Sequence, residues 1–293
     1  MTWISAAAGK LPWWAKIAGK VILSRLPVSG KVWQKLGLFS PGLMWRPDYA
    51  IGVFDFHYRA AGAPAAGFKY LELGPGDSVA SAVVGKAYGA ALGWLVDSGS
   101  YASRDMDLYR DVARRLEAER PGANLGALRE VGGFEDLLRA CNTSFLEHGL
   151  ASLRQVPAES CDFIFSEAVL EHVPLGEFDA VMGELHRILK PGGVATHRVD
   201  FRDHLGGGWN NLRFSAGLWE APWFAQRSGF YTNRLRLSAM TERLQGAGFA
   251  VEVPQRSSWP APPIARDLLK GEFQYLSEED LMTDQALILA RKP

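Results

Sequence analysis

Short apolar runs alternate with longer segments of helical periodicity from about residue 66 to the C-terminus. Alternation of this kind is typical of a parallel sheet covered by helices. In the helical segment 179–189, apolar residues recur three and four positions apart, and the Pro-Gly-Gly turn at 191–193 is expected to stop the helix. Seven strands are predicted, at residues 70–73, 93–96, 143–146, 162–165, 194–199, 248–253 and 285–290. The pattern therefore predicts the α/β fold class.

The first 65 residues do not follow this alternation, and their charge differs from that of the remainder. Seven of the 32 basic residues precede the first acid, Asp48, which leaves 25 basic against 32 acidic residues in the rest of the chain. We predict a basic helical extension or cap at 1–65 and one large domain at 66–293. An acidic main domain disfavours nucleic acid as a partner.

The segment 13–26 is amphipathic when drawn as a helix. Lys16, Lys20 and Ser24 follow one line along the helix, whereas Trp13, Trp14, Ile17, Val21 and Ile22 lie on the other side. Tryptophan combined with lysine suits a membrane interface, so one interpretation is peripheral contact with the inner membrane surface. The other interpretation is a cap that packs on the main domain with its lysines in water.

Two further features concern the cellular compartment. No uninterrupted apolar run reaches the roughly 18 residues that span a bilayer. Cys141 and Cys161 lack the spacing of a metal site and are expected to be buried, reduced side chains. We therefore expect a cytoplasmic protein.

A glycine-bearing turn follows the first predicted strand. Residues 69–78 read Lys-Tyr-Leu-Glu-Leu-Gly-Pro-Gly-Asp-Ser. Gly74 and Gly76 allow a sharp turn and close approach of the backbone to a ligand, and the helix that begins near Ser78 directs its free N–H groups there. Val79 occupies the place of the third glycine of the dinucleotide fingerprint, which favours a cofactor without phosphates. Asp97 ends the second strand, where it could accept hydrogen bonds from ribose hydroxyls.

With these residues identified, the chain resembles class I S-adenosylmethionine-dependent methyltransferases. Residues 72–76 resemble the first motif of that family, and Asp97 resembles its ribose-binding acid. Residues 162–166 and 169–173 resemble its fourth strand and the helix entry beside the methyl donor, and residues 189–193 resemble the turn before its fifth strand. The resemblance implies a Rossmann-like fold: a seven-stranded, mostly parallel sheet with helices on both faces, whose last two strands pair antiparallel.

The same resemblance implies S-adenosylmethionine as the cofactor. Glu72 would help to arrange the glycine turn, with a strand-end charge in solvent as the alternative. Residues 148–151 would border the adenine. The residues expected at the cofactor are Glu72, Gly74, Pro75, Gly76, Asp77, Ser78, Asp97, Ser98, Gly149, Leu150, Ser166, Glu167 and His172.

A long segment, 202–236, separates the fifth strand from the helix predicted around 237–245. Loops of this length are usually functional or disordered, and the many aromatic residues of this one argue against disorder. In an open α/β sheet it would emerge at the carboxyl ends of the strands, where ligands bind. We therefore predict an insert that recognises the methyl acceptor.

Several residues in and beside this insert could contact an acceptor. Arginine forks suit phosphate or carboxylate, and tryptophan offers a flat platform for a sugar, although surface arginines and buried tryptophans are the commoner cases. The predicted substrate-binding residues are Asp200, Arg213, Trp219, Asn233, Arg234 and Arg236.

His204 is the first candidate for a general base. It follows the fifth strand, with Asp203 beside it to orient the ring, and both are predicted to be catalytic. His172 is the alternative base. Asp200, Asp203 and His204 could also hold a divalent ion, but three such residues are weak evidence, and no metal is predicted.

The acceptor is expected to be a small molecule or a glycan. Residues 200–204 and 233–236 resemble bacterial methyltransferases of polysaccharide and surface-glycan biosynthesis, which implies O-methylation of a saccharide or glycan-linked acceptor. Methylation of a lipid or secondary metabolite, or a catalytically silent scaffold, are the alternatives.

Overall fold

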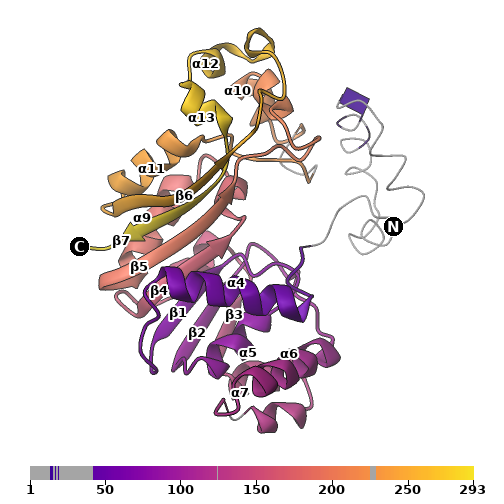
Figure 1. Ribbon diagram of the computed structural model, residues 1–293, viewed down its shortest axis with the longest axis vertical. Coiled ribbons are helices and arrows are strands. Elements are labelled where there is room, and N and C mark those ends of the chain that lie inside the picture. The colour runs from indigo at the N-terminus through magenta and orange to yellow at the C-terminus, as the bar shows by residue number, and fades with distance from the viewer. Residues whose placement is uncertain (1–13, 16, 18, 20–41, 124, 225–228) are drawn as a thin grey trace.

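The structure is a computed structural model that describes residues 14, 15, 17, 19, 42–123, 125–224 and 229–293. It contains one seven-stranded sheet with the strand order β3-β2-β1-β4-β5-β7-β6 (Figure 1). The strands are β1 (Lys69–Leu73), β2 (Leu92–Val96), β3 (Thr143–Leu146), β4 (Cys161–Glu167), β5 (Leu189–Asp200), β6 (Ala250–Ser258) and β7 (Thr283–Arg291).

Strand pairing follows the predicted topology. Strands β1 to β5 pair parallel, and β7 pairs antiparallel with both β5 and β6. The carboxyl ends of β1 to β5 therefore lie at the same edge of the sheet. The predictions of a Rossmann-like sheet and of an antiparallel final pair are confirmed.

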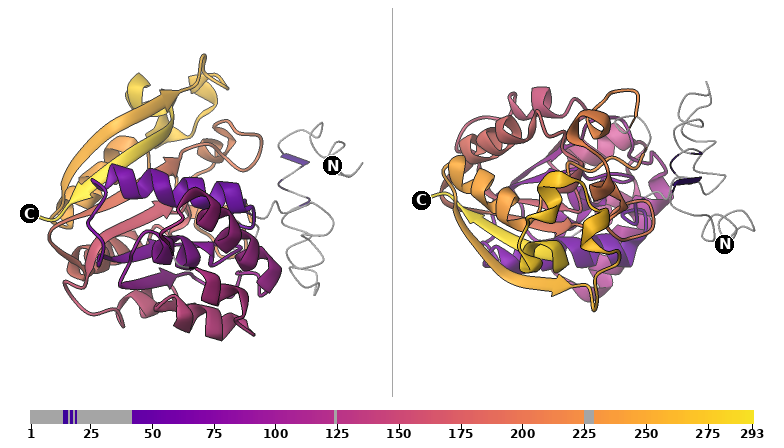
Figure 2. Two further views of the ribbon diagram at one scale, coloured as in Figure 1. Left: turned by 60° about the horizontal axis from the view of Figure 1, so that its bottom comes forward. Right: turned by 90° about the horizontal axis from the view of Figure 1, so that it is seen from above.

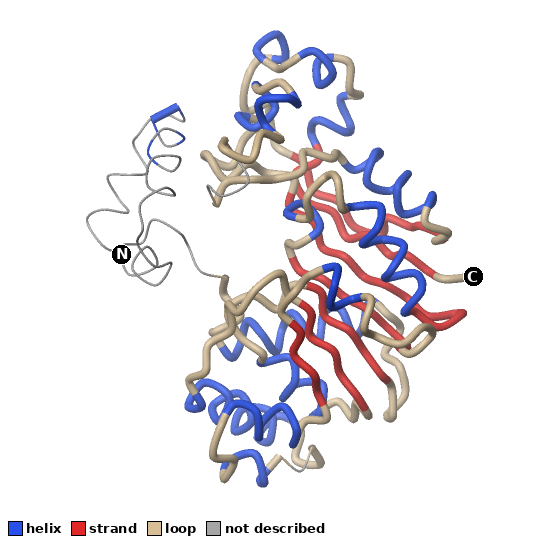
Figure 3. Tube along the Cα trace, turned by 180° about the vertical axis from the view of Figure 1, so that it is seen from behind, coloured by secondary structure: helices blue, strands red, loops and turns tan. Residues whose placement is uncertain are grey.

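Helices cover the sheet in two layers, which Figure 1 and Figure 3 show from opposite sides. One layer holds α4 (Pro47–Ala60), α5 (Ala80–Ala87), α6 (Met106–Glu119) and α7 (Phe134–Ala140). The other holds α8 (Leu150–Leu153), α9 (Phe178–Ile188) and α11 (Leu237–Gly246). Apolar spacing explains this arrangement: α9 buries Phe178, Val181, Met182 and Leu185 on one face. Each layer thus closes a separate hydrophobic core.

Helix α4 falls within the range predicted as a separate extension, yet it forms part of the main domain. Phe54 and His57 are fully buried, and Phe54 makes edge contacts with Tyr70 and Phe165 of the sheet. The domain therefore begins before residue 66. Most of the amphipathic segment 13–26, including Lys16 and Lys20, lies outside the described residues.

The turn at 191–193 does not stand between the helix and the strand as predicted. Helix α9 ends at Ile188, and β5 begins directly at Leu189. Residues 190–193 instead form an irregular start of β5, where the register with β4 shifts between Cys161 and Phe163. Extended backbone at Leu189, rather than the glycines, ends the helix.

Two excursions leave the sheet beyond β5 and β6. The predicted insert holds η3 (Asn210–Arg213) and α10 (Ala216–Trp219). A second excursion lies between β6 and β7 and was not predicted. It holds η4 (Arg266–Leu268), α12 (Gly271–Gln274) and α13 (Glu278–Met282). They pack side by side (Figure 2), because Trp209 and Leu212 of the insert share a core with Leu269, Phe273 and Leu281.

Within the described part of the chain, no helix has both the length and the apolar character needed to cross a bilayer.

Candidate functional site

The glycine turn after β1 adopts the conformation that its sequence suggests. Gly74 and Gly76 have φ angles of +73° and +69°, in the left-handed region that favours glycine. A Cβ on Gly74 would lie 2.5 Å from Cγ2 of Val169, whereas a Cβ on Gly76 would meet nothing within 4 Å. Gly74 therefore has a steric reason to be glycine in addition to its conformation.

Asp97 connects this turn to the loop after β2. Its Oδ2 accepts a hydrogen bond from Gly76 N–H at 2.9 Å, and its Oδ1 accepts one from Ser98 N–H at 2.7 Å. Its backbone carbonyl accepts from Gly149 N–H at 2.7 Å, and Gly149 has φ +50°. Burial raises the pKa of Asp97, whereas the hydrogen bonds from Gly76 and Ser98 lower it. The carboxylate and the backbone carbonyl of Asp97 together thus join three loops at the carboxyl edge of the sheet.

A cavity of about 220 Å³ opens beside these loops. It brings together six of the residues predicted at the cofactor: Gly74, Asp97, Ser98, Gly149, Leu150 and His172. The remaining wall is largely apolar. Leu73, Val169 and Val173 belong to the motifs compared with the donor site, whereas the other residues of this wall were not predicted. The full set in the remaining wall is Leu73, Val96, Leu153, Val169, Val173, Pro174, Glu177 and Val181.

Glu72 lies at the end of β1 but not in the cavity wall. Its side chain is buried, and its Oε2 has no hydrogen-bond partner among the described residues. Burial raises the pKa of Glu72 to about 8, and the negative charges of Asp97 and Glu167 add to that effect. The alternative of a solvated strand-end charge is therefore wrong.

Residues 75–78 support the turn and do not line the cavity. Ser78 is fully buried; its hydroxyl donates to the carbonyl of Met44 at 2.7 Å. The carbonyl of Asp77 accepts from Ser103 N–H at 2.8 Å. Pro75 precedes Gly76 in the same turn. The prediction that Ser78 binds the cofactor is corrected, because its side chain ties the N-terminal segment to the turn.

Ser166 and Glu167 also differ from the prediction. Oγ of Ser166 lies 2.8 Å from Nδ1 of His197, a buried side chain whose pKa burial lowers to about 3. Glu167 accepts hydrogen bonds from Arg198, including one of 2.8 Å from Nε, and pairs with His57 at 3.2 Å. Both residues are thus committed to neighbours in the sheet and α4, and neither lines the cavity.

His172 and His204 form a pair beside the cavity. Their Nε2 atoms are 3.1 Å apart, and the ring centroids are 4.8 Å apart. Nδ1 of His172 lies 3.0 Å from the carbonyl oxygen of Tyr231, which can only accept, so Nδ1 carries the proton. Burial lowers the pKa of His172 and favours its neutral form. Nε2 of His172 is then the acceptor within the histidine pair, and Nε2 of His204 is the donor.

Asp203 does not have the predicted catalytic role. Its buried carboxylate accepts hydrogen bonds from the backbone N–H groups of Leu205 and Gly207, both at 2.9 Å, and of Asn210. Asp203 therefore organises the loop that carries His204. Asp200 pairs with the guanidinium of Arg202 at 2.7 Å. Within the described part of the chain, no group of three His, Cys, Asp or Glu side chains could hold a metal ion.

Glu171 is a buried acid that the predictions did not include. Its Oε1 accepts from Asp200 N–H at 3.2 Å, and its Oε2 has no partner among the described residues. Burial raises the pKa of Glu171 to about 8, and the charge of Asp200 adds to the effect. A neutral acid therefore lies next to His172 in the sequence.

Asn233 was predicted to bind substrate, but it holds the turn that carries His172. Its side-chain amide donates to the carbonyls of Leu170 at 2.7 Å and Val173 at 3.0 Å. Its backbone N–H donates to the carbonyl of Glu171 at 2.7 Å. With its side chain buried and both amide hydrogens used, Asn233 positions the cavity wall and is not exposed to a substrate.

Tyr231 contacts the same turn. Its carbonyl accepts from His172, and its hydroxyl accepts from Leu175 N–H at 3.1 Å while donating to Glu220 at 2.9 Å. We call Tyr231 and Asn233 the insert clamp. The insert is therefore joined directly to the cavity.

The structure also corrects the roles of Arg236, Arg234 and Trp219. Arg236 is buried and donates to the carbonyls of Phe201, at 2.9 Å, and of Asp280, Leu281 and Thr283. Burial lowers its pKa to about 10. The arginine thus fastens the insert to the second excursion.

Arg234 and Trp219 belong to the interior of the insert. Arg234 donates to the carbonyl of Phe214 at 2.7 Å and lies over the ring of Trp219. Trp219 is fully buried, and its Nε1 donates to the carbonyl of Thr232 at 2.7 Å. Arg213 is half-buried at the end of η3, and its predicted role with the substrate stays a prediction.

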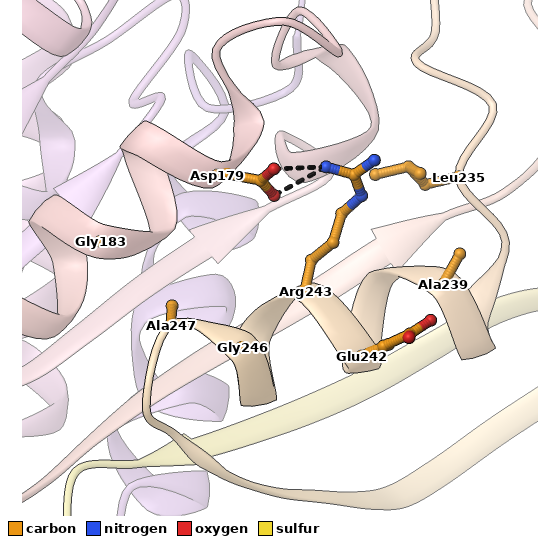
Figure 4. A pocket seen from close by; sticks show the side chains of 8 residues that line it. All are labelled: Asp179, Gly183, Leu235, Ala239, Glu242, Arg243, Gly246 and Ala247. Atoms are coloured by element: carbon orange, nitrogen blue, oxygen red, sulfur yellow. Dashed lines mark hydrogen bonds and ion pairs between the residues drawn. The ribbon is translucent and has the colours of Figure 1, made fainter.

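A larger hollow of about 680 Å³ lies elsewhere, between α9 and α11 (Figure 4). Arg243 crosses it and donates to both carboxylate oxygens of Asp179 at 2.7 Å. The other lining residues are mostly small or apolar: Gly183, Leu235, Ala239, Gly246 and Ala247, with Glu242. It shares no lining residue with the smaller cavity beside the glycine turn, and its lining offers no pair of groups suited to proton transfer.

The smaller cavity has three properties that fit S-adenosylmethionine. A carboxylate at Asp97 can accept hydrogen bonds from ribose hydroxyls, and the apolar wall that includes Leu150 and Val169 suits a flat ring. A side chain at position 74 would clash with Val169, so glycine keeps the space beside the turn open for a ligand. These residues would hold the cofactor.

Three solved structures that are similar to this chain share 14 to 16% sequence identity with it. Phosphoethanolamine N-methyltransferase 2 of Haemonchus contortus, in complex with phosphomonomethylethanolamine and S-adenosylhomocysteine, is 16% identical with a TM-score of 0.45; the match covers 83% of this chain and 53% of that one. The chain thus spans about half the length of the Haemonchus protein. An O-methyltransferase family protein of Burkholderia thailandensis is 14% identical with a TM-score of 0.47, covering 96% and 68%. YcgJ of Bacillus subtilis is 14% identical with a TM-score of 0.46, covering 84% and 99%.

The family assignment comes from a different comparison. No curated protein matches the sequence. Residues 48–253, which include α4, the glycine turn and the insert, match the family described as "Methyltransferase domain". The chain therefore belongs to the methyltransferase-domain family.

Proposed function

We propose that the protein is an S-adenosylmethionine-dependent methyltransferase that transfers a methyl group to a hydroxyl of a saccharide or glycan-linked acceptor. The observation that carries this proposal is the cavity in which the glycine turn, Asp97 and His172 meet, with His204 3.1 Å from His172. The saccharide class is supported by the resemblance of residues 200–204 and 233–236 to enzymes of surface-glycan biosynthesis.

The chain's own contribution to the reaction begins with positioning. When bound, S-adenosylmethionine supplies a methyl group activated by a sulfonium. Asp97 would orient the ribose, and the apolar cavity wall would exclude water from the transfer. Alignment of donor and acceptor can supply on the order of 7 to 11 kcal/mol of the rate acceleration in favourable cases.

The histidine pair would remove the acceptor proton. In this proposal the ring of His204 is neutral and accepts a proton at Nδ1, because its Nε2 donates to His172. The acceptor hydroxyl would give its proton to Nδ1 of His204, while the methyl group would leave the sulfonium sulfur for the acceptor oxygen. The imidazolium that forms keeps its hydrogen bond to neutral His172, which stabilises it. Such a base typically contributes about a hundredfold to ten-thousandfold.

Calorimetric titration of the full chain with S-adenosylmethionine, S-adenosylhomocysteine and NAD tests the donor assignment. We expect both sulfur compounds to bind and NAD not to bind. Replacement Asp97→Ala should weaken S-adenosylhomocysteine by about 1 to 3 kcal/mol, because it removes hydrogen bonds to a charged group. Tighter binding of NAD than of S-adenosylhomocysteine would overturn the proposal.

The acceptor class requires a separate experiment. When labelled S-adenosylmethionine is the donor, the label should be recovered in a glycan fraction. The label should resist mild base, because a methyl ether is stable there. Label recovered only in amine-containing products would contradict O-methylation and leave the donor assignment intact.

A further inference from the structure

Exposed aromatic and apolar side chains gather at the carboxyl edge of the sheet, where the donor cavity opens. Three of them lie on loops that meet at Asp77 of the glycine turn. The segment 42–45 is held there because Ser78 donates to the carbonyl of Met44, and the loop after β2 is held there because Ser103 N–H donates to the carbonyl of Asp77. We name this group the loop patch: Leu43, Trp45 and Tyr101, which are 43%, 50% and 60% exposed.

A second group lies on the insert side of the same edge. Ile17 and Phe224 belong to one hydrophobic cluster with Leu205, the neighbour of His204, and with Tyr231 of the insert clamp. Trp14, one helical turn before Ile17, and Trp223, which contacts Phe224, extend from this cluster and are 61% and 60% exposed. We name them the insert patch. The two patches therefore adjoin the glycine turn and the histidine pair respectively.

We infer that this edge docks on the surface of an anionic lipid membrane. Tryptophan and tyrosine combine an apolar ring with a polar group, which suits the boundary between lipid and water. The N-terminal charge also suits an anionic surface. Seven basic residues and no acidic residue precede Asp48, and Arg46 is adjacent to Trp45. Basic residues near a membrane surface are attracted by acidic lipids.

The position of the patches fits a lipid surface. The wall of the donor cavity includes Gly74 of the glycine turn and His172 of the histidine pair, the two features that the patches adjoin. A membrane at this edge could therefore present an acceptor to the cavity. On the proposed function, the acceptor is then a lipid-linked molecule, such as a glycan carried on a lipid.

The test measures sedimentation of the full chain with vesicles of equal phosphatidylcholine and phosphatidylglycerol, without donor. Two variants keep every lysine and arginine: Leu43→Ser with Trp45→Ala and Tyr101→Ser for the loop patch, and Trp14→Ala with Trp223→Ala for the insert patch. If each patch buries on the order of 60 Å² of apolar surface, each variant should lose about tenfold in vesicle partitioning. The matched control is Val253→Ser, an exposed apolar residue within β6, which should change partitioning less than about twofold.

Two outcomes would overturn the inference. One is no sedimentation of the wild-type chain; the other is equal partitioning of the wild type and both patch variants, which would assign binding to the cations alone. Single replacements Tyr101→Ser and Trp223→Ala, at sites 60% exposed, provide the same test if a multiple variant does not fold. Titration with S-adenosylhomocysteine in the absence of vesicles tests the proposed function independently, because neither patch lines the donor cavity.

Discussion

At the donor cavity, backbone N–H groups donate to the carboxylate of Asp97, whereas in the insert the guanidinium of Arg236 donates to backbone carbonyls. The two regions use the same kinds of interaction with the charges reversed. The cavity leaves space and polar atoms for a ligand, whereas Asn233, Arg234 and Arg236 of the insert donate to backbone carbonyls of the protein. A charged residue near a ligand-binding edge can therefore serve the ligand or the fold: Asp97 lines the cavity, whereas Arg236 does not.

The largest expected effect concerns the histidine pair. Replacement His204→Ala should lower turnover about a hundredfold to ten-thousandfold, because the acceptor proton loses its base. Affinity for S-adenosylhomocysteine should change less than about threefold, since His204 does not line the cavity. Single-turnover kinetics and calorimetry measure the two quantities. His172→Ala is the comparison: a collapse confined to that variant would reverse the roles of the two histidines.

On the insert side, Arg236→Met should lower the free energy of unfolding by about 3 to 5 kcal/mol, because buried carbonyls that accept from a cation lose their donor. Chemical denaturation measures this difference. Arg243→Met is the matched control, since Arg243 pairs with exposed Asp179 and should contribute about 0 to 1 kcal/mol. Equal losses in the two variants would contradict the structural role of Arg236.

The two glycines of the donor turn can be compared with each other. Gly74→Ala should weaken S-adenosylhomocysteine by about 2 to 3 kcal/mol, because a left-handed conformation and a clash with Val169 both oppose the side chain. Gly76→Ala should weaken S-adenosylhomocysteine by only about 1 to 2 kcal/mol, because only the left-handed conformation opposes a side chain there. The double variant Gly74→Ala with Val169→Ala should recover part of the affinity. No recovery in calorimetry would mean that Val169 is not the obstacle.

Expressed per pH unit, the smallest predicted effect is a pH dependence of stability. The pKa of Glu171 is raised by burial from 4.5 to about 8, so the folded state binds more protons than the unfolded state between these values. Stability from this group is complete below pH 4.5 and decreases as pH rises toward 8, by at most about 1.4 kcal/mol per pH unit. Glu171→Gln should flatten that slope in denaturation measured from pH 5 to 8. An unchanged slope would show that Glu171 is ionised in the fold.

The strands and the donor turn could be predicted because their signals are local. Glycines at 74 and 76, an acid at the end of β2 and apolar runs of strand length all lie within short stretches of sequence. The second excursion, 259–282, was missed because its three helical pieces are only three to five residues long and carry no periodicity.

The errors at the site share one physical cause. Ser166 and Glu167 follow the β4 pattern of a donor site, but their partners His197 and His57 are 31 and 110 residues away in the chain. Arg236 likewise finds its carbonyls 35 to 47 residues away. A side chain's partners over such distances are set by packing, which the local sequence does not contain. Residue type alone therefore predicted contacts with a ligand for side chains that instead bind other parts of the protein.

The insert clamp has a consequence for the order of events in catalysis. Asn233 and Tyr231 hold the turn 170–175, so a shift of the insert that admits an acceptor also displaces the wall that retains the donor. Binding at two sites that share one element is reciprocal: whatever tightens one site tightens the other by the same factor. The residence time of the spent donor should then depend on whether product still occupies the insert. Release of the two products, and not methyl transfer, would then be the rate-limiting step of turnover.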